Sequence, residues 1–181
     1  MSDENLEVLR TDFWNALRRH LKECSSLLQP GNTTYGRWLN FKLGEFKGMS
    51  PLKKHITINQ YITIVWVEGS KAQAIGDCRS YYVRATYDSL NDKSDNATRS
   101  RRWLQFMRER EKTIHYQLGF ELDWDDSREK DIYLKSPNVI ADIRNLDAWP
   151  GYINDMRIQA EHLHTAFQPH ALAFTEAYQH R

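Results

Sequence analysis

Residues 96–135 read NATRSRRWLQFMREREKTIHYQLGFELDWDDSREKDIYLK, and this stretch joins a basic helix to an acidic strand. Its first half spaces Trp103 and Met107 as one face of a helix, and Gly119 is a natural stop for that helix. From Phe120 onward, apolar and acidic residues alternate as they do in a half-buried strand. The stretch therefore predicts a helix that runs directly into a β-hairpin, with a cationic surface beside an anionic one.

The register of this hairpin follows from requiring both strands to turn their apolar residues to the same side. Opposing Trp124 with Ile132 meets this requirement, because alternate residues of a strand point to opposite faces of the sheet. The same register sets Glu121 against Lys135. The acidic strand is therefore expected to face a cation across the hairpin.

The rest of the chain has a helical stripe at its start, three strand-like segments, and another helical stripe near its end. Pro30 ends the first helix, and Pro169 stands where a short last helix can begin. The predicted helices cover residues 6–29 and 96–118, with two more beginning at residues 147 and 169. The predicted strands cover residues 37–43, 55–67, 80–87, 120–126 and 130–135, with a bulge or an interruption of the second at residues 59–60.

The order of these elements is α-β-β-β-α-β-β-α-α. It predicts an α+β fold in which two long helices and the C-terminal helices pack on one mostly antiparallel sheet of about five strands. No internal repeat, low-complexity tract or long linker is found, so residues 1–181 are expected to form a single domain.

Composition excludes several classes of protein. The chain has 181 residues, and 25 Lys and Arg against 24 Asp and Glu give a formal net charge of +1. With no overall cationic field, any binding of nucleic acid must be local. Cys24 and Cys78 fit neither a zinc site nor a disulfide framework, which favours a reducing compartment. No leader or membrane-spanning segment is found, so a cytoplasmic protein without membrane contact is expected.

The predicted helix at 96–118 is rich in cations. Cations near the start of a helix oppose its dipole, so they add little local stability there and favour a role in phosphate or carboxylate binding. The alternative is a solvated helix face that pairs with the acidic hairpin. The predicted nucleic-acid or partner-binding residues are Arg99, Arg101, Arg102, Arg108 and Lys112.

Two other sets of residues raise site hypotheses. Glu121, Asp123 and Asp125 share one strand face, but a single strand spaces such residues by about 6.5–7 Å and cannot gather three carboxylates around a metal ion. Tyr82 and Arg84 interleave aromatic and cationic character with Tyr81 and Tyr87, which on an exposed sheet could stack bases, although at least one set should be core. No nucleophile or nucleotide-binding motif occurs, so no catalytic residue, metal or cofactor is predicted.

The order of several motifs resembles a known family. These motifs are Phe13-Trp14, the Trp38 strand, the 82–87 strand, the Leu118-Gly119 to Trp124 segment and the Trp149 helix, which together span residues 9–174. The chain resembles the bacterial and archaeal domain of unknown function found beside restriction-endonuclease-like and type I restriction-modification proteins. The resemblance implies a role in DNA restriction or defence and no particular reaction.

The opening order α-β-β-β-α-β also resembles the core of restriction nucleases. That resemblance implies an acidic residue on one strand and an acidic-x-Lys pattern on the next, which hold a metal ion that activates water. Residues 62–68 and 82–88 do not carry this pattern. The expected catalytic set is therefore missing, and fold analogy cannot replace it.

Three hypotheses follow from the sequence. The first is a non-catalytic accessory module that contacts DNA, other nucleic acid or a nuclease subunit through the basic helix. The second is a divergent metal-dependent nuclease that uses Glu121 or Asp123 with another acid such as Asp88. The third is a protein–protein scaffold, since charge complementarity serves protein partners equally well. A homodimer is open under all three.

Overall fold

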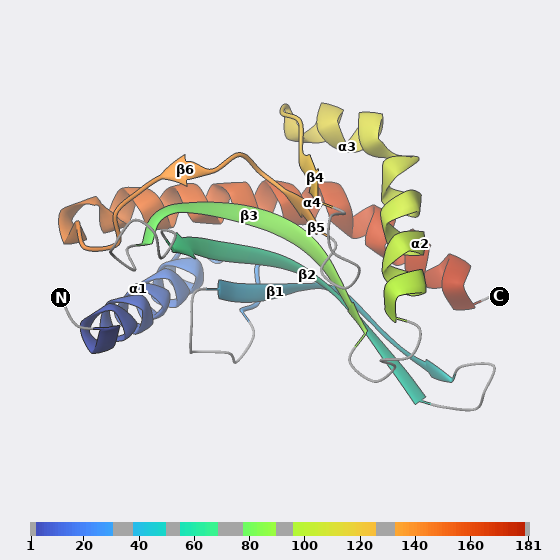
Figure 1. The fold of residues 1–181 in the computed structure, drawn as a ribbon, viewed down its shortest axis with the longest axis horizontal. Helices are drawn as coiled ribbons and strands as arrows, with labels where there is room; N and C mark the ends of the chain where they lie inside the picture. The colour runs from blue at the N-terminus through green and yellow to red at the C-terminus, as the bar shows by residue number, and fades with distance from the viewer. Residues whose placement is uncertain are drawn as a thin grey trace.

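The computed structural model of the chain describes residues 3–30, 38–49, 55–68, 78–89, 96–125 and 133–179. Within these residues the fold is mixed helix and strand, in agreement with the predicted α+β class (Figure 1). The helices are α1 (Asp3–Glu23), α2 (Asn96–Arg108), α3 (Glu111–Leu118) and α4 (Trp149–Gln179), with a short 3-10 helix η2 (Leu146–Ala148) before α4. The strands are β1 (Trp38–Met49), β2 (His55–Glu68), β3 (Cys78–Ser89), β4 (Asp123–Asp125), β5 (Tyr133–Lys135) and β6 (Val139–Ile140).

The strands form one six-stranded antiparallel sheet, for which the sequence pattern predicts about five strands. The main path through the sheet is β1-β2-β3-β5-β4. β6 pairs with β3 at Ser80 and Tyr81, on the edge that β5 occupies further along the strand. Figure 1 shows α4 running along the length of the curved sheet, with α1 near one end of the molecule and α2 near the other.

The hydrophobic core lies between the helices and one face of the sheet. Leu39, Ile64 and Ala85 come from three neighbouring strands and are fully buried. Each α-helix adds side chains to the same cluster, among them Phe13 of α1, Trp103 of α2, Ile114 of α3 and Phe167 of α4. Burial of a large apolar side chain contributes about 1.5–3 kcal/mol, so this shared cluster holds the helices on the sheet.

A half-buried polar network fixes the segment after α1 against α4. Ser26 Oγ donates a hydrogen bond to Glu161 Oε1 at 2.6 Å, and Arg157 Nη1 donates to Glu161 Oε2 at 2.7 Å. The carboxylate of Glu161 thus has a partner on each oxygen, which it needs when it is half-buried. The network supplements the apolar contacts between the two helices.

The pairing of β4 with β5 corrects the predicted hairpin register. Trp124 pairs with Leu134 and Asp123 pairs with Lys135, which is a shift of two residues from the register that opposes Trp124 with Ile132. A two-residue shift returns every side chain to the same face, so the apolar and polar alternation fits both registers. β5 also pairs with β3, and this third strand is outside the local pattern from which the prediction was made.

Helix α1 ends earlier than its apolar stripe predicts. The helix ends at Glu23. Leu28 is buried as well, but it belongs to the segment that follows the helix. Ser25 has a φ of 51°, and the N–H of Ser26 donates to the carbonyl of Leu21 at 2.9 Å. These features form a Schellman-type helix end with serine in the left-handed position. Because that position usually holds glycine, the sequence carries no clear stop signal here.

Strand β1 is longer than predicted and carries the bulge. It continues to Met49, where the sequence pattern predicts a connection from Gly44 onward. Its pairing with β2 shifts between Lys42 and Gly44, which leaves Leu43 as the extra residue. β2 runs through residues 59–60 without an interruption, and the bulge of the ladder lies beside them, because Lys42 pairs with Tyr61 and Gly44 pairs with Gln60. Pairing with β2 satisfies the backbone of β1 beyond its glycines, which local propensity does not take into account.

The long helix predicted at residues 96–118 is two helices, separated by a turn at Glu109 and Arg110. Arg110 has φ −112° and ψ 6°, and its Nη1 donates to the carbonyl oxygen of Phe106 at 2.7 Å. The side chain thereby satisfies one of the last carbonyls of α2. Met107 and Ile114 keep helical spacing across the turn, so periodicity alone does not reveal the break.

In the C-terminal region, the two helices predicted to begin at residues 147 and 169 are a single helix. This helix, α4, contains Pro169. Proline inside a helix costs about 3 kcal/mol, since it lacks the N–H that would donate to the carbonyl four residues earlier. Phe167 and Ala171, on either side of the proline, are both fully buried in the core. A continuous helix keeps both side chains buried, and this burial offsets the cost of the proline.

Gly119 ends α3 with a φ of 74°, a left-handed conformation that costs a residue with a Cβ about 1–2 kcal/mol. A Cβ added at Gly119 would meet no atom within 4 Å, so only the backbone conformation carries a cost. We expect Gly119→Ala to lower the free energy of unfolding by about 1–2 kcal/mol, measured by urea denaturation.

The matched control for this variant is Gly151→Ala. Gly151 also has open space around its Cβ position but lies in α4, where alanine is favoured. The control should equal the wild type or gain up to about 1 kcal/mol. Equal losses in the two variants would show that the left-handed conformation is not what Gly119 supplies.

Candidate nucleic-acid interface

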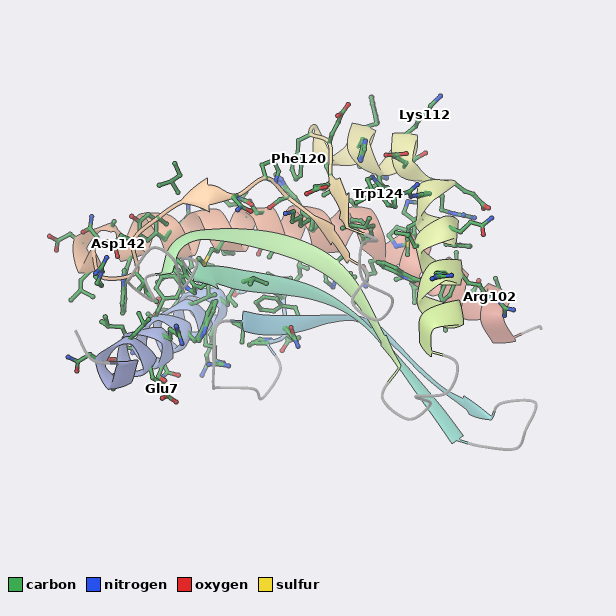
Figure 2. The ribbon with its side chains drawn as sticks, in the orientation of Figure 1. Glu7, Arg102, Lys112, Phe120, Trp124 and Asp142 are labelled. Carbon is green, nitrogen blue, oxygen red and sulfur yellow. The ribbon has the colours of Figure 1, made fainter. Side chains whose placement is uncertain are left out.

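Helix α2 carries four arginines and no acidic residue. Trp103 and Met107 are fully buried, so one side of the helix is held against the core. Arg101 and Arg102 are exposed. Figure 2 shows Arg102 at the end of the molecule away from α1. The core contact of α2 thus leaves part of the predicted basic cluster on the surface.

The predicted cluster extends over two helices. Lys112 is exposed on α3, which follows α2 after the turn, and Figure 2 shows it at the same end of the molecule as Arg102. Arg99 belongs to the N-terminal part of α2. The fold therefore gathers the predicted binding residues at one end of the protein, but along two helix axes.

Two arginines near the turn contact aromatic rings of the protein itself. Cζ of Arg108 lies 5.5 Å from the ring centroid of Trp124, a cation–π contact that joins α2 to β4. Cζ of Arg110 lies 3.5 Å from the ring centroid of Phe106. Phe106 and Arg110 are four residues apart, which is the sequence signal for this second contact. Arg108, a predicted binding residue, thus also connects the helix to the hairpin.

At least one carboxylate of the acidic strand forms an ion pair with a residue of the neighbouring hairpin strand. Asp123 Oδ2 lies 3.2 Å from Lys135 Nζ, and the two residues pair across β4 and β5. Glu121 lies before β4, is exposed, and does not oppose Lys135 as the sequence predicts. The carboxylate of Asp123 is therefore neutralised by a strand lysine rather than by an arginine of α2.

The strand register does not bring the acids of the nuclease hypothesis together. Arg84 pairs with Lys135, which pairs with Asp123, whereas Asp88 lies four residues further along β3. Four residues of a strand span about 13 Å, whereas a magnesium ion holds its ligands at about 2.0–2.1 Å. In the part of the chain that the structure describes, no three His, Cys, Asp or Glu side chains form a group suited to a metal ion.

Strand β3 divides its aromatic and cationic residues between the two faces of the sheet. Tyr81 pairs with Trp66, which is fully buried on the helix-covered face. Tyr87 shares this face, because it is an even number of residues from Tyr81. Tyr82 and Arg84 alternate with these residues and so belong to the opposite face. The register of β3 therefore divides the set considered for base stacking.

The pH dependence of stability should reflect His170 in α4. Burial and, second, the positive charge of Arg110 lower the pKa of His170 below its usual 6.5. Its Nε2 is buried without a hydrogen-bond partner among the described residues. Below pH 6.5 the unfolded chain therefore binds more protons at this histidine than the folded chain does. The free energy of unfolding then falls as the pH falls. We expect His170→Gln to reduce this loss in denaturation curves between about pH 8 and pH 5.

His162→Gln is the control for this experiment. His162 lies on the same helix and is exposed, so its replacement removes a histidine of α4 that is not buried. If His170→Gln loses as much stability on acidification as the wild type and the control, the environment of His170 does not penalise its protonation.

Comparisons with protein-family models, curated proteins and solved structures found no match for this chain. The family resemblance noted in the sequence therefore stays a prediction. Among the residues that the structure describes, no helix combines the length and the apolar character needed to cross a membrane.

Proposed function

We propose that this protein is a non-catalytic accessory module, acting in the cytoplasm, that contacts nucleic acid through the basic cluster on α2 and α3. The observation that carries the proposal is the charge of α2, which has four arginines and no acidic residue while the whole chain has a net charge of only +1. Its link to DNA restriction or defence rests on the sequence resemblance.

The position of the charges along α2 favours an external anion. Arg99, Arg101 and Arg102 lie in the first half of the helix, where the helix dipole is positive and disfavours cations. The first turn of the helix has no acidic residue to offset them. A bound phosphate removes this repulsion and accepts paired hydrogen bonds from a guanidinium group.

Phosphate groups fit this surface better than a single carboxylate does. The cluster extends from α2 to Lys112 on α3, so it suits a ligand with several negative charges in a row. A nucleic-acid backbone has this property. Because the cluster is local and the net charge is small, we expect modest affinity that depends strongly on salt.

The test of the proposal is the binding of a labelled DNA duplex and a labelled RNA duplex, measured by fluorescence anisotropy between about 50 and 200 mM salt. Binding that weakens linearly in a plot of log K against log salt supports the proposal. Absence of binding at the lowest salt would refute it and would favour a protein partner, such as a nuclease subunit, for the same residues.

A further inference from the structure

Tyr116 of α3 is the most exposed aromatic side chain in the part of the chain that the structure describes. It is 89% exposed, whereas every other Phe, Trp and Tyr side chain described there is buried or half-buried. Aromatic rings usually lie at least partly against the protein, because their burial contributes to stability. The exposure of Tyr116 leaves nearly the whole ring available to a ligand.

Helical spacing places Tyr116 on the outer side of α3. Ile114 and Leu118 are buried, and Tyr116 lies opposite them because successive residues of a helix are about 100° apart. Lys112 comes four residues earlier, so its Cβ lies about 5–6 Å from that of Tyr116 on the same side. It is exposed, and Figure 2 shows it pointing away from the rest of the molecule. A cation and an aromatic ring are thus neighbours on this outer side.

The acids of the turn and of α3 contact other residues of the protein. Glu109 Oε2 lies 3.5 Å from Arg110 Nη1 in the turn before α3. Glu111 Oε1 lies 4.0 Å from His115 Nε2, which accepts a hydrogen bond from the N–H of Leu122 at 3.1 Å. Glu111 and His115 therefore face the segment that leads into β4, and not the outer side of α3.

The surroundings of Tyr116 keep a cationic balance when the next acid is included. Glu121 is exposed after the end of α3. Residues 96–121 then hold six Lys and Arg against three acids. Further along the chain, Asp123 is paired with Lys135 at 3.2 Å. The exposed ring is therefore part of a net cationic region.

An exposed aromatic ring beside a cation suits an unpaired base. The bases of a duplex are stacked on one another, so a side chain reaches the face of a base only where that base is unpaired. The ring then stacks with the base, and the cation contacts a neighbouring phosphate. A protein partner would also cover the ring, but the cations around it favour a ligand with negative charges in a row.

From this arrangement we infer that the basic cluster on α2 and α3 binds a single-stranded segment of nucleic acid, with a base stacked on Tyr116 and a neighbouring phosphate on Lys112. The inference rests on the proposed function and deepens it, because it names the form of nucleic acid that the same cluster takes. The arginines of α2 supply the contacts to further phosphates of the strand.

The experiment measures the anisotropy of labelled oligothymidylate and, separately, of a labelled DNA duplex of equal length. We expect the wild type to bind the single strand more tightly than the duplex. Tyr116→Leu removes the ring and keeps a good helix former, and it should weaken single-strand binding by about 5- to 150-fold, which corresponds to one lost stack. Its binding to the duplex should not change, because the paired bases do not reach the ring.

Three further variants complete the experiment. Lys112→Gln should reduce the slope of log K against log salt by about 0.7, the value for one phosphate on a single strand. Tyr116→Phe keeps the ring and should keep the preference for the single strand. Thr113→Ala is the matched control, because Thr113 is exposed on the same helix but has neither a ring nor a charge, and it should bind like the wild type.

The results separate a failure of this inference from a failure of the proposed function. If neither the single strand nor the duplex binds, both fail. If the duplex binds at least as tightly as the single strand, or if Tyr116→Leu binds the single strand as Thr113→Ala does, the inference alone is overturned. Circular dichroism checks the fold of each variant, and the preference of the wild type decides the question if Tyr116→Leu does not fold.

Discussion

Replacing Phe13 by alanine should lower the free energy of unfolding by about 3–5 kcal/mol, the largest effect on stability that we expect from one substitution in this protein. Phe13 is fully buried and lies at the meeting point of three tryptophans. Its ring centroid is 5.5 Å from that of Trp14, 5.1 Å from that of Trp66 and 5.2 Å from that of Trp149, all in edge-to-face geometry. The variant would lose contacts that join α1, β2 and α4 at once, and it would leave a cavity.

Urea or guanidinium denaturation measures this effect, with two variants for comparison. Phe13→Leu keeps much of the volume and should lose clearly less than the alanine variant. Val8→Ala, on the same helix but 58% exposed, should stay within about 0.5 kcal/mol of the wild type. A loss below about 1 kcal/mol for Phe13→Ala would mean that the three-tryptophan contact does not hold the helices on the sheet.

Replacing Arg99, Arg101 and Arg102 together by alanine should weaken nucleic-acid binding and flatten its salt dependence while the fold is kept. Each phosphate contact contributes about 0.9 to the slope of log K against log salt for duplex DNA, so loss of up to three contacts should reduce the slope by about 2–3. The fold should survive because Arg101 and Arg102 are exposed and the core contacts of α2 come from other residues.

A pair of double variants separates this contact from a general effect of charge. Arg101→Ala with Arg102→Ala removes two cations from α2, and Arg19→Ala with Lys22→Ala removes two exposed cations from α1. The net charge is the same in both proteins, so only the first should change the salt slope. An unchanged slope in the α2 variants would count decisively against the proposed interface.

The hairpin shows where prediction from sequence reaches its limit. Alternation of Leu122, Trp124 and Leu134 correctly indicates which side chains are buried or half-buried toward the core. It does not fix the register, because a shift of two residues preserves that alternation. The contact of Asp123 with Lys135 follows from the observed register and not from the predicted one. Pairing of β5 with β3 supplies the missing information.

Helix boundaries show the same limit. Gly119 is a stop that can be read from the sequence, because only a residue without a Cβ takes its conformation at little cost. Ser25 ends α1 and Arg110 ends α2 through hydrogen bonds. Neither serine nor arginine is a residue type that predicts a helix end. Pro169 predicts a helix boundary, but α4 continues through it. The continuous helix keeps the side chains on both sides of the proline buried in the core.

The sequence by itself determined the α+β class, the apolar faces of the helices and strands, and the presence of a cationic segment, because these depend on local spacing and composition. Only the tertiary structure decided the strand register, the division between α2 and α3, and which cations are exposed. It also decided that Val65 pairs with Trp38 on one side and with Tyr82 on the other. These features depend on pairing and packing between residues far apart in the chain, which local pattern does not encode.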